Sequence, residues 1–267
     1  MKVSSKEIWE SVEAIRTQAP LVHNITNYVV MNITANALLA IGASPVMAHA
    51  CEEVEEMAGI AGALVINIGT LSEHWIEAMF KAAERAGERK IPVVFDPVGA
   101  GATKYRTDTS RRFVESFSPA IIRGNASEIM ALETRDIKTK GVDSSAASSD
   151  AVEIGRSLNA ASGSVVCISG ETDYIIDGDA VAEIRNGHPM MQRVTGLGCT
   201  ATALCGAFAA VEKNAMAAAA QAMAVMGIAG EMAAGKAEGP ASLQGRFIDI
   251  LYSMTESDIE RYLKKED

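Results

Sequence analysis

Residues 63–95 read ALVINIGTLSEHWIEAMFKAAERAGERKIPVVF, two short apolar runs on either side of a helical pattern. The runs Ala63–Ile68 and Pro92–Phe95 are rich in β-branched residues and bounded by Gly, Pro or polar residues, as buried strands usually are. Between them, Ser72–Ala86 opens with an acid, closes with a base and stops at Gly87, the order that a helix dipole favours. This succession predicts one unit of a layered α/β domain with a parallel sheet.

The same alternation continues in both directions along the chain. A hairpin is predicted around Asp177-Gly178, and the Ala-rich segment 199–234 is predicted to be helical. Further candidate elements are the strands Leu21–Ile25, Pro45–Met47, Ala120–Ile122 and Val165–Ser169, and the helix Tyr28–Ile41. No stretch reads as a linker, so residues 1–267 are expected to form a single domain, with the polar segment 134–150 as a surface loop leading into a helix.

The composition argues against several classes of protein. The chain has 24 Lys+Arg against 34 Asp+Glu, a formal charge of −10, which argues against nucleic acid as the main partner. None of the four Cys belongs to a CxxC pair and no secretory leader opens the chain, so we expect a reducing cytoplasm. Residues 194–211 are as long as a membrane span, but they are rich in Gly, Ala and Thr, which predicts a buried helix and no membrane partner.

Residues 17–51 contain no Asp, Glu, Lys or Arg, yet four Asn recur inside them. One interpretation is a buried first layer of the fold. The other is a subunit interface with a neutral, hydrogen-bonding ligand pocket, because interface cores are depleted in charge. The two interpretations are compatible, and the residues alone favour neither.

The best candidate for an anion site is the run Thr195-Gly196-Leu197-Gly198-Cys199-Thr200. Gly196 and Gly198 let the backbone approach a ligand, and the free N–H groups of the following helix favour negative charge. Such a turn is also found at ordinary helix starts. Cys199 lies in the first helical turn, where we expect a lowered thiol pKa that lets it accept a proton; the alternative is a small buried residue.

Two further polar groups follow predicted strands. Asp96 comes after the strand 92–95, where it is placed to bind Mg²⁺ through water or to face a phosphate. Arg123 follows the next strand and suits an ATP phosphate, while Asn125 and Glu128 lie one helical turn apart and suit Mg²⁺ or its water. A capping motif would explain the Asn-x-x-Glu pattern equally well.

These pieces occur in an order that resembles a known family. The motifs are HNITNYVVMN, GASPVMAHA, LVINIGTL, FDPVGAGAT, RGNASEI and NGHPMMQRVTGLGC. From about residue 10 to residue 250 the chain resembles the hydroxyethylthiazole kinase family. The resemblance implies a ribokinase-like three-layer α/β fold with helices on both faces of the sheet. It also implies a cytoplasmic homotrimer that uses Mg²⁺ and ATP to phosphorylate the hydroxyl of 4-methyl-5-(2-hydroxyethyl)thiazole in thiamine biosynthesis and salvage.

The resemblance also assigns roles to matching positions. It places Met47 and Gly196 on the thiazole, Arg123 and Ser169 on ATP, Asp96 and Glu128 at phosphate and Mg²⁺, and Asn24 and Gly69 in the thiazole pocket, which in the family lies between subunits. Cys199 then helps to take the hydroxyl proton, and the amides of residues 196–199, Gly198 included, stabilise the developing charge. The chain departs from the family in Ser169, where Thr is common, and in the bulky Leu197.

Two functions of other classes stay open at this point. One is a nucleotide-dependent dehydratase of the same fold that repairs hydrated nicotinamide cofactors, which usually carries Asp at the position of Cys199. The other is a thiazole-binding protein without catalysis. The motifs HNITNYVV and GASPVMAHA favour the thiazole over a hydroxymethylpyrimidine substrate.

Overall fold

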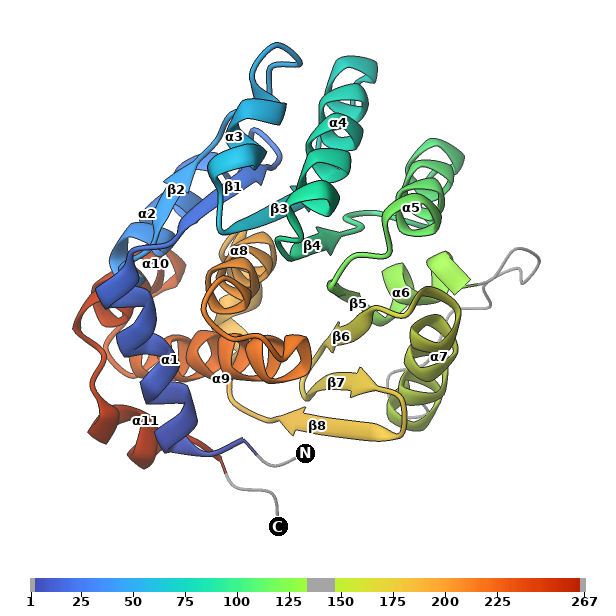
Figure 1. Ribbon diagram of the computed structural model, residues 1–267. Helices are drawn as coiled ribbons and strands as arrows, with labels where there is room; N and C mark the ends of the chain where they lie inside the picture. Colours follow the sequence, from blue (N-terminus) through green and yellow to red (C-terminus); the bar gives the residue numbers. More distant parts are fainter. Residues whose placement is uncertain (1–2, 134–146, 265–267) are drawn as a thin grey trace.

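The computed structural model describes residues 3–133 and 147–264. In these ranges one sheet of eight strands has the order β2-β1-β3-β4-β5-β6-β7-β8 (Figure 1). Strands β1 to β6 are parallel, and β7 and β8 are antiparallel additions at one edge. The strands are β1 (Leu21–Ile25), β2 (Ser44–Val46), β3 (Ala63–Asn67), β4 (Val93–Asp96), β5 (Ile121–Asn125), β6 (Val165–Ser169), β7 (Asp173–Asp177) and β8 (Ala180–Ile184).

Helices cover both faces of this sheet (Figure 1). Those of one layer are α3 (Val54–Ile60), α4 (Glu73–Arg89), α5 (Lys104–Phe117), α6 (Ala126–Glu133) and α7 (Ala147–Ser162). Those of the other are α1 (Ser5–Gln18), α2 (Met31–Ile41), α8 (Leu197–Ala209), α9 (Ala215–Ala234), α10 (Pro240–Ser253) and α11 (Glu256–Tyr262), with the short 3₁₀ helix η1 (Pro189–Arg193) before α8. The three-layer α/β fold implied by the sequence is confirmed.

Two apolar cores form because successive strand residues point to opposite faces. In β3, Val65 joins the core under α8 and α9, whereas Leu64 and Ile66 join the core under α3 to α7. In β5, Ile121 and Ile122 divide in the same way. Strands buried on both faces read as continuous apolar runs, which is why the runs in the sequence predicted them.

The predicted elements differ from the structure mainly at their ends. The helix predicted from Tyr28 begins at Met31, because residues 28–30 form a turn. The predicted helical segment 199–234 is two helices, and Asn214 begins the second by accepting a hydrogen bond from the N–H of Ala217 at 2.9 Å. Residues 134–146 of the predicted surface loop lie outside the described residues, and α7 begins at Ala147.

Helix α9 is long and apolar enough to cross a membrane by length and composition alone. Of its most apolar window, 83% is buried inside the molecule. Helix α9 packs against α8 and α10 and reaches β7 and β8. Burial therefore explains its composition as that of a core helix.

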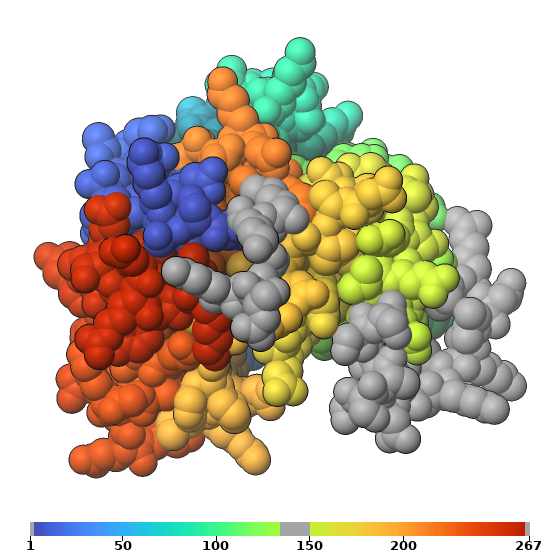
Figure 2. Space-filling view, turned by 90° about the horizontal axis from the view of Figure 1, so that it is seen from below, coloured from blue at the N-terminus to red at the C-terminus, as the bar shows by residue number. Residues whose placement is uncertain are grey.

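The two ends of the described chain lie together. Helix α1 contacts α11, and the blue N-terminal and red C-terminal parts are neighbours in Figure 2. Arg16 of α1 donates hydrogen bonds to the carbonyl oxygens of Leu251 and Tyr252. The C-terminal helices are thus fastened to the same face of the sheet as α8 and α9.

Helix α8 approaches the sheet closely at Gly206. A Cβ atom at this position would lie 2.5 Å from Cγ2 of Val65, inside any allowed contact distance. We predict that Gly206→Ala lowers the free energy of unfolding by about 1–3 kcal/mol, because the added methyl group overpacks the contact. Urea unfolding of both forms measures this difference.

Gly245 is the matched control, since it lies in α10 with no atom within 4 Å of an added Cβ. Gly245→Ala is expected to leave stability unchanged or to raise it by up to about 1 kcal/mol through helix propensity. Equal effects of the two substitutions would contradict the close approach at Gly206.

Candidate active site

A buried carboxylate stands at the carboxyl edge of the parallel strands. Asp96 ends β4 and is 1% exposed. Its Oδ2 accepts hydrogen bonds from Nδ2 of Asn67 at 2.8 Å and from Oγ1 of Thr202 at 2.7 Å. Asn67 ends the neighbouring strand β3 and Thr202 lies in α8, so this carboxylate joins the sheet edge to the first turns of α8.

The network continues from Asn67 to the cysteine. Nδ2 of Asn27 donates to Oδ1 of Asn67 at 2.8 Å and lies 3.5 Å from Sγ of Cys199. The N–H of Gly69 donates to the same Oδ1 at 3.0 Å. A Cβ at Gly69 would lie 2.5 Å from Nδ2 of Asn27, so only glycine leaves room for this amide. The structure thus places Gly69 beside Asn67 and Asn27, which it contacts through its backbone.

The glycine turn before α8 is built as the sequence predicted. Gly196 begins the helix with a φ of +88°, and a Cβ there would lie 2.8 Å from Cγ1 of Val30. A Cβ at Gly198 would lie 3.2 Å from Nη1 of Arg123, which shows how closely the guanidinium approaches the helix start. The free N–H groups of this turn and the cation therefore face the same space.

Cys199 lies in the first turn of α8, but its acidity is the reverse of the expectation. Burial raises the pKa of the Cys199 thiol to about 11, and the nearby charge of Asp96 adds to the rise. Hydrogen bonds from Asn67 and Asn27 and the charge of Arg123 lower the pKa by less. The prediction of a lowered pKa was wrong, because desolvation outweighs the helix N-terminus. The resting group is a neutral thiol.

Asp96 is also harder to ionise than a free carboxylic acid. Burial raises the pKa of Asp96 to about 6, and the charge of Glu128 adds to the rise. The charge of Arg123 and the hydrogen bonds from Thr202 and Asn67 oppose it. Asp96 is therefore mostly ionised at neutral pH, next to a buried cation.

Arg123 and Ser169 meet across the ends of β5 and β6. Nη2 of Arg123 donates to Oγ of Ser169 at 2.8 Å, while Nε is buried without a partner. Both residues line a cavity of about 650 Å³ together with Gly198. A buried guanidinium with an unused donor at a cavity wall suits an anionic ligand. The structure brings together the two residues predicted for ATP.

Glu128 is held by backbone donors. Its Oε2 accepts from the N–H of Asn125 at 2.9 Å, and its Oε1 accepts from the N–H of Gly99 at 2.8 Å. Oδ1 of Asn125 in turn accepts from the N–H of Glu128 at 2.9 Å. This reciprocal pair confirms the capping alternative, so the Asn125 amide has a structural partner. The Glu128 carboxylate lies close enough to Asp96 to act on its pKa.

Among the described residues there is no group of three or more His, Cys, Asp or Glu side chains that could hold a metal. Mg²⁺ is usually bound in kinases by one or two carboxylates, waters and the substrate phosphates. Asp96 and Glu128 fit that mode, because they are two carboxylates near each other at the site. They do not form a closed cage of protein ligands.

The residues predicted for the thiazole are divided in the structure. Gly196 and Gly69 lie near Cys199, as described above. Met47 follows the edge strand β2, with β1 between that strand and β3. Asn24 has no exposed surface in β1, and its Nδ2 donates to the carbonyl of Val22 at 2.9 Å. The amide next to Cys199 belongs to Asn27 instead.

Besides Asn27, three site residues were not singled out from the sequence. Asn67 interrupts an apolar run at a strand end, which is a signal that could have identified it. Thr202 lies one turn after Cys199, but nothing in the sequence distinguishes it from a helix-packing threonine. Arg106 of α5 donates to the carbonyls of Ile68, Gly69 and Val98 and so fixes two of the loops. Only the folded structure shows that this side chain contacts loops distant from it in the sequence.

The sequence model of the hydroxyethylthiazole kinase family matches residues 12–257. The chain belongs to the hydroxyethylthiazole kinase family. A relative from Syntrophus aciditrophicus, named hydroxyethylthiazole kinase, is 64% identical over 265 residues, which are 99% of this chain and 98% of the relative. The family resemblance of the motifs is thereby confirmed.

Solved structures agree with this family. A hydroxyethylthiazole kinase protein from Pyrococcus horikoshii superposes with a TM-score of 0.90 at 44% identity, covering 97% of this chain and 98% of that one. A ribokinase-like superfamily protein from Enterococcus faecalis has a TM-score of 0.68 at 13% identity, with 98% and 95% covered, which supports the fold alone. The ribokinase-like fold expected of the hydroxyethylthiazole kinase family is confirmed.

The ionisation of Asp96 predicts a pH dependence of activity. The family resemblance assigns Asp96 to phosphate and Mg²⁺, and for that role an ionised carboxylate predicts that kcat/KM falls as pH is lowered through about 6. The folded pKa lies above the ordinary value of 3.8, so this group favours the folded state more as pH falls through that window. The loss of activity should therefore precede acid unfolding, which circular dichroism at each pH checks.

Asp96→Asn is the matched control for the pH profile. If the residual kcat/KM of this variant still falls as pH is lowered, the titrating group is on the nucleotide and is not Asp96. A wild-type kcat/KM that stays constant from pH 7 to pH 5 would contradict the assignment.

Proposed function

We propose that the chain transfers the γ-phosphoryl group of ATP to the hydroxyl of 4-methyl-5-(2-hydroxyethyl)thiazole, a step of thiamine biosynthesis and salvage. Membership of the hydroxyethylthiazole kinase family makes it a phosphotransferase. The single observation that supports the site is the cavity of about 650 Å³, in which Arg123 and Ser169 face the glycine turn that leads to Cys199. We assign this cavity to ATP and the Cys199 side of the turn to the thiazole.

The first part of the proposal is charge stabilisation by fixed groups. The amides of residues 196–199 point at the transferring phosphoryl group, and Arg123 balances the charge that develops on its oxygens. Ser169 accepts a hydrogen bond from the guanidinium and lines the cavity that we assign to the nucleotide. These groups are held by strand ends and a helix start, so little reorganisation is needed during the reaction.

Mg²⁺ belongs to this proposal through Asp96 and Glu128, which would hold it directly or through water. When bound, the ion supplies charge neutralisation between phosphate oxygens. The hydrogen bonds from Asn67 and Thr202 fix the Asp96 carboxylate. The backbone donors of Gly99 and Asn125 fix that of Glu128. Each carboxylate is thus oriented before a ligand arrives.

Cys199 has a smaller role than a strong base would have. A thiol with a pKa of about 11 is not ionised at neutral pH, so it serves mainly to place the substrate hydroxyl by a hydrogen bond. In a loose phosphoryl-transfer transition state the hydroxyl proton leaves late, when a phosphate oxygen can also take it. Most of the catalysis then comes from positioning and from Arg123.

We also propose a homotrimer with active sites at the subunit interfaces. Tyr28 and Val29 before α2, Leu39 within α2 and Ile60 at the end of α3 are exposed by 58% to 67%. Tyr28, Val29 and Leu39 belong to the charge-free stretch 17–51, whose helix α2 packs against the edge strand β2. Ile60 ends α3, which packs against β1 and α4. The edge position of Met47 suits a thiazole pocket that a second copy completes.

Two further proposals concern the chain as a whole. We propose that residues 1–267 form a single kinase domain, because the described strands belong to one sheet. We propose a cytoplasmic location, because all four cysteines are free thiols.

An ADP-release assay with Mg²⁺-ATP tests the function. Hydroxyethylthiazole should stimulate release by the purified protein, and hydroxymethylpyrimidine should not. Release without any alcohol dependence, or none with either alcohol, would contradict the proposal. Activity on hydrated nicotinamide cofactors would then favour the dehydratase of the same fold. Stabilisation by the thiazole without ATP consumption would favour a binding protein.

Variants of the site separate the proposed roles. Cys199→Ala should retain measurable turnover, lowered by no more than about 10²-fold, because the thiol is not a strong base. Arg123→Ala and Glu128→Ala should lose more, about 10³-fold for Arg123, because they remove charge stabilisation. Steady-state kinetics give these values. Cys205→Ala, in the same helix but buried in the core, is the thiol control and should leave kcat unchanged. An inactive Cys199→Ala that still binds ATP would contradict this order.

Sedimentation equilibrium tests the oligomer. The wild type should have three times the 28.1 kDa mass of the chain. Leu39→Glu or Ile60→Glu should give monomers with weakened thiazole binding, because a charge is buried in the interface. Tyr105→Glu is the control, since it lies at the start of α5, away from the β2 edge. A monomeric wild type that binds thiazole would refute the shared site.

A further inference from the structure

One wall of the proposed ATP cavity is built by the segment that connects β8 with η1. Residues 185–188 of this segment and the first residue of η1, Pro189, line the cavity, on elements separate from Arg123 and Ser169. Lys264, at the end of the described chain, lines the same cavity. A residue about 140 positions after Arg123 thus contributes to the same pocket.

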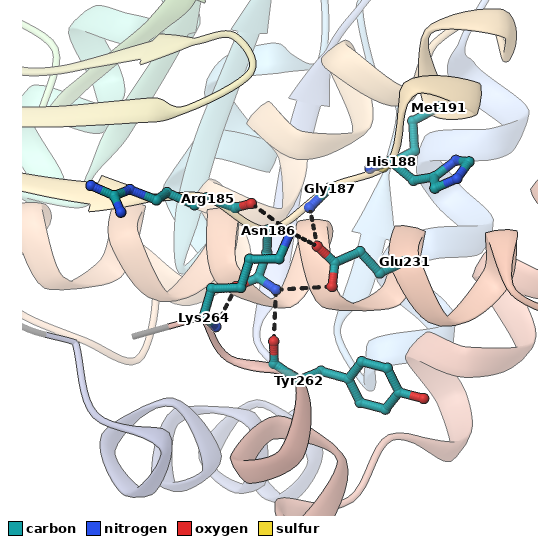
Figure 3. Close-up of polar contacts among 8 residues, drawn as sticks. All are labelled: Arg185, Asn186, Gly187, His188, Met191, Glu231, Tyr262 and Lys264. Atoms are coloured by element: carbon teal, nitrogen blue, oxygen red, sulfur yellow. Dashed lines mark hydrogen bonds and ion pairs between the residues drawn. The ribbon is translucent and has the colours of Figure 1, made fainter. Parts of the chain in front are cut away.

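Glu231 of α9 anchors this wall (Figure 3). Its Oε1 accepts a hydrogen bond from the N–H of Gly187 at 2.8 Å, and its Oε2 accepts one from Nδ2 of Asn186 at 3.2 Å. The sequence of α9 contains no other charged residue. A carboxylate in an otherwise apolar helix, with backbone and amide donors from one loop, fixes that loop against the helix.

The C-terminal segment is tied to the same wall. Nζ of Lys264 lies 2.6 Å from Oε1 of Glu231 and donates to the carbonyl of Arg185 at 3.0 Å. The N–H of Lys264 donates to Oδ1 of Asn186 at 3.1 Å. Nδ2 of Asn186 donates to the carbonyl of Tyr262 at 2.8 Å. Figure 3 shows the three segments meeting at Asn186 and Glu231.

The backbone conformation of this wall and its close contact with α9 fix the position of residues 186 and 187. Gly187 has a φ of +146°, which disfavours other residues. A Cβ at Gly227 of α9 would lie 2.5 Å from the carbonyl oxygen of Asn186, so the wall rests directly on the helix. Asn186 is 6% exposed. Its amide is therefore satisfied by Glu231 and the C-terminal segment rather than by solvent.

The positive charge of Lys264 offsets the negative charge of Glu231 at this wall of the cavity. An unpaired Glu231 would place a negative charge behind a wall that faces a polyphosphate. Lys264 balances that charge, and its side chain, which is 49% exposed, is among those that line the cavity. The pair therefore shapes the wall and also keeps its potential compatible with an anionic ligand.

We propose that Glu231 and Lys264 are positioning residues for the nucleotide, and that docking of the C-terminal segment 262–264 onto residues 185–187 is coupled to ATP binding. The inference rests on the proposed assignment of the cavity to ATP. Coupling is reciprocal: the docked segment raises nucleotide affinity, and bound nucleotide stabilises the docked segment. The thiazole, on the other side of the glycine turn, is outside this coupling.

Steady-state kinetics of Glu231→Gln and Lys264→Met test the proposal. Both variants should raise the KM for ATP by about 5-fold or more, while kcat and the KM for the thiazole stay within about 2-fold. Lys264→Arg should restore most of the affinity, because it keeps the cation. Glu238→Gln and Lys236→Met are the charge-matched controls, since both side chains are exposed after the end of α9. They should leave the KM for ATP unchanged.

Hydrogen exchange supplies a readout that a purely structural role would not change. In the wild type, ADP should slow the exchange of the amides of residues 256–264, and this protection should be lost in Lys264→Met. Lys264 lies at the end of the described chain, so this variant should fold even where Glu231→Gln does not, and thermal melting confirms that it does.

The possible outcomes separate the inference from the function on which it rests. If Arg123→Ala weakens ATP binding while Lys264→Met changes neither the KM for ATP nor the exchange, the coupling is wrong and the ATP assignment stands. If neither Lys264→Met nor Arg123→Ala changes ATP binding, the assignment of the cavity to ATP is wrong, and so is the coupling that rests on it.

Discussion

The burial of one carboxylate at the carboxyl edge of the sheet constrains everything placed around it. Asp96 has lost its water, and the amide of Asn67 and the hydroxyl of Thr202 replace that water with donors of fixed direction. Thr202 lies on α8, so satisfying the carboxylate also sets the position of the helix start against the strand ends. The glycine turn and Cys199 begin the same helix and are therefore placed together with Thr202.

Much of the fold followed from local pattern. The apolar runs identified the strands because strands covered on both faces must be apolar throughout, and the polar residues after those runs met at one edge because parallel strands end together. Asp96, Arg123 and Glu128 were found in this way. Element ends were less predictable: the break before Asn214 depends on one capping side chain within a long Ala-rich segment, which composition does not reveal.

What the sequence missed was set by tertiary environment. A cysteine in a helical first turn has a predictable electrostatic bias, but the extent of its burial is decided by the layers that close over it, and burial prevailed. The resemblance named Asn24, which lies inside β1, whereas the amide next to Cys199 is that of Asn27, which follows the end of the strand. Arg106 and Lys264 act on segments far away in the sequence, so no motif or spacing could connect them with the site.

The neutral state of the Cys199 thiol limits its reaction with the electrophiles and peroxides that a cell contains. Electrophiles and peroxides react with thiolates, and with a pKa of about 11 only roughly one Cys199 thiol in ten thousand is ionised at pH 7. A cysteine can therefore stand in the centre of this site without becoming a sensor of oxidants or a target of alkylating agents. The same desolvation that weakens the residue as a base also lowers its reactivity toward oxidants and alkylating agents.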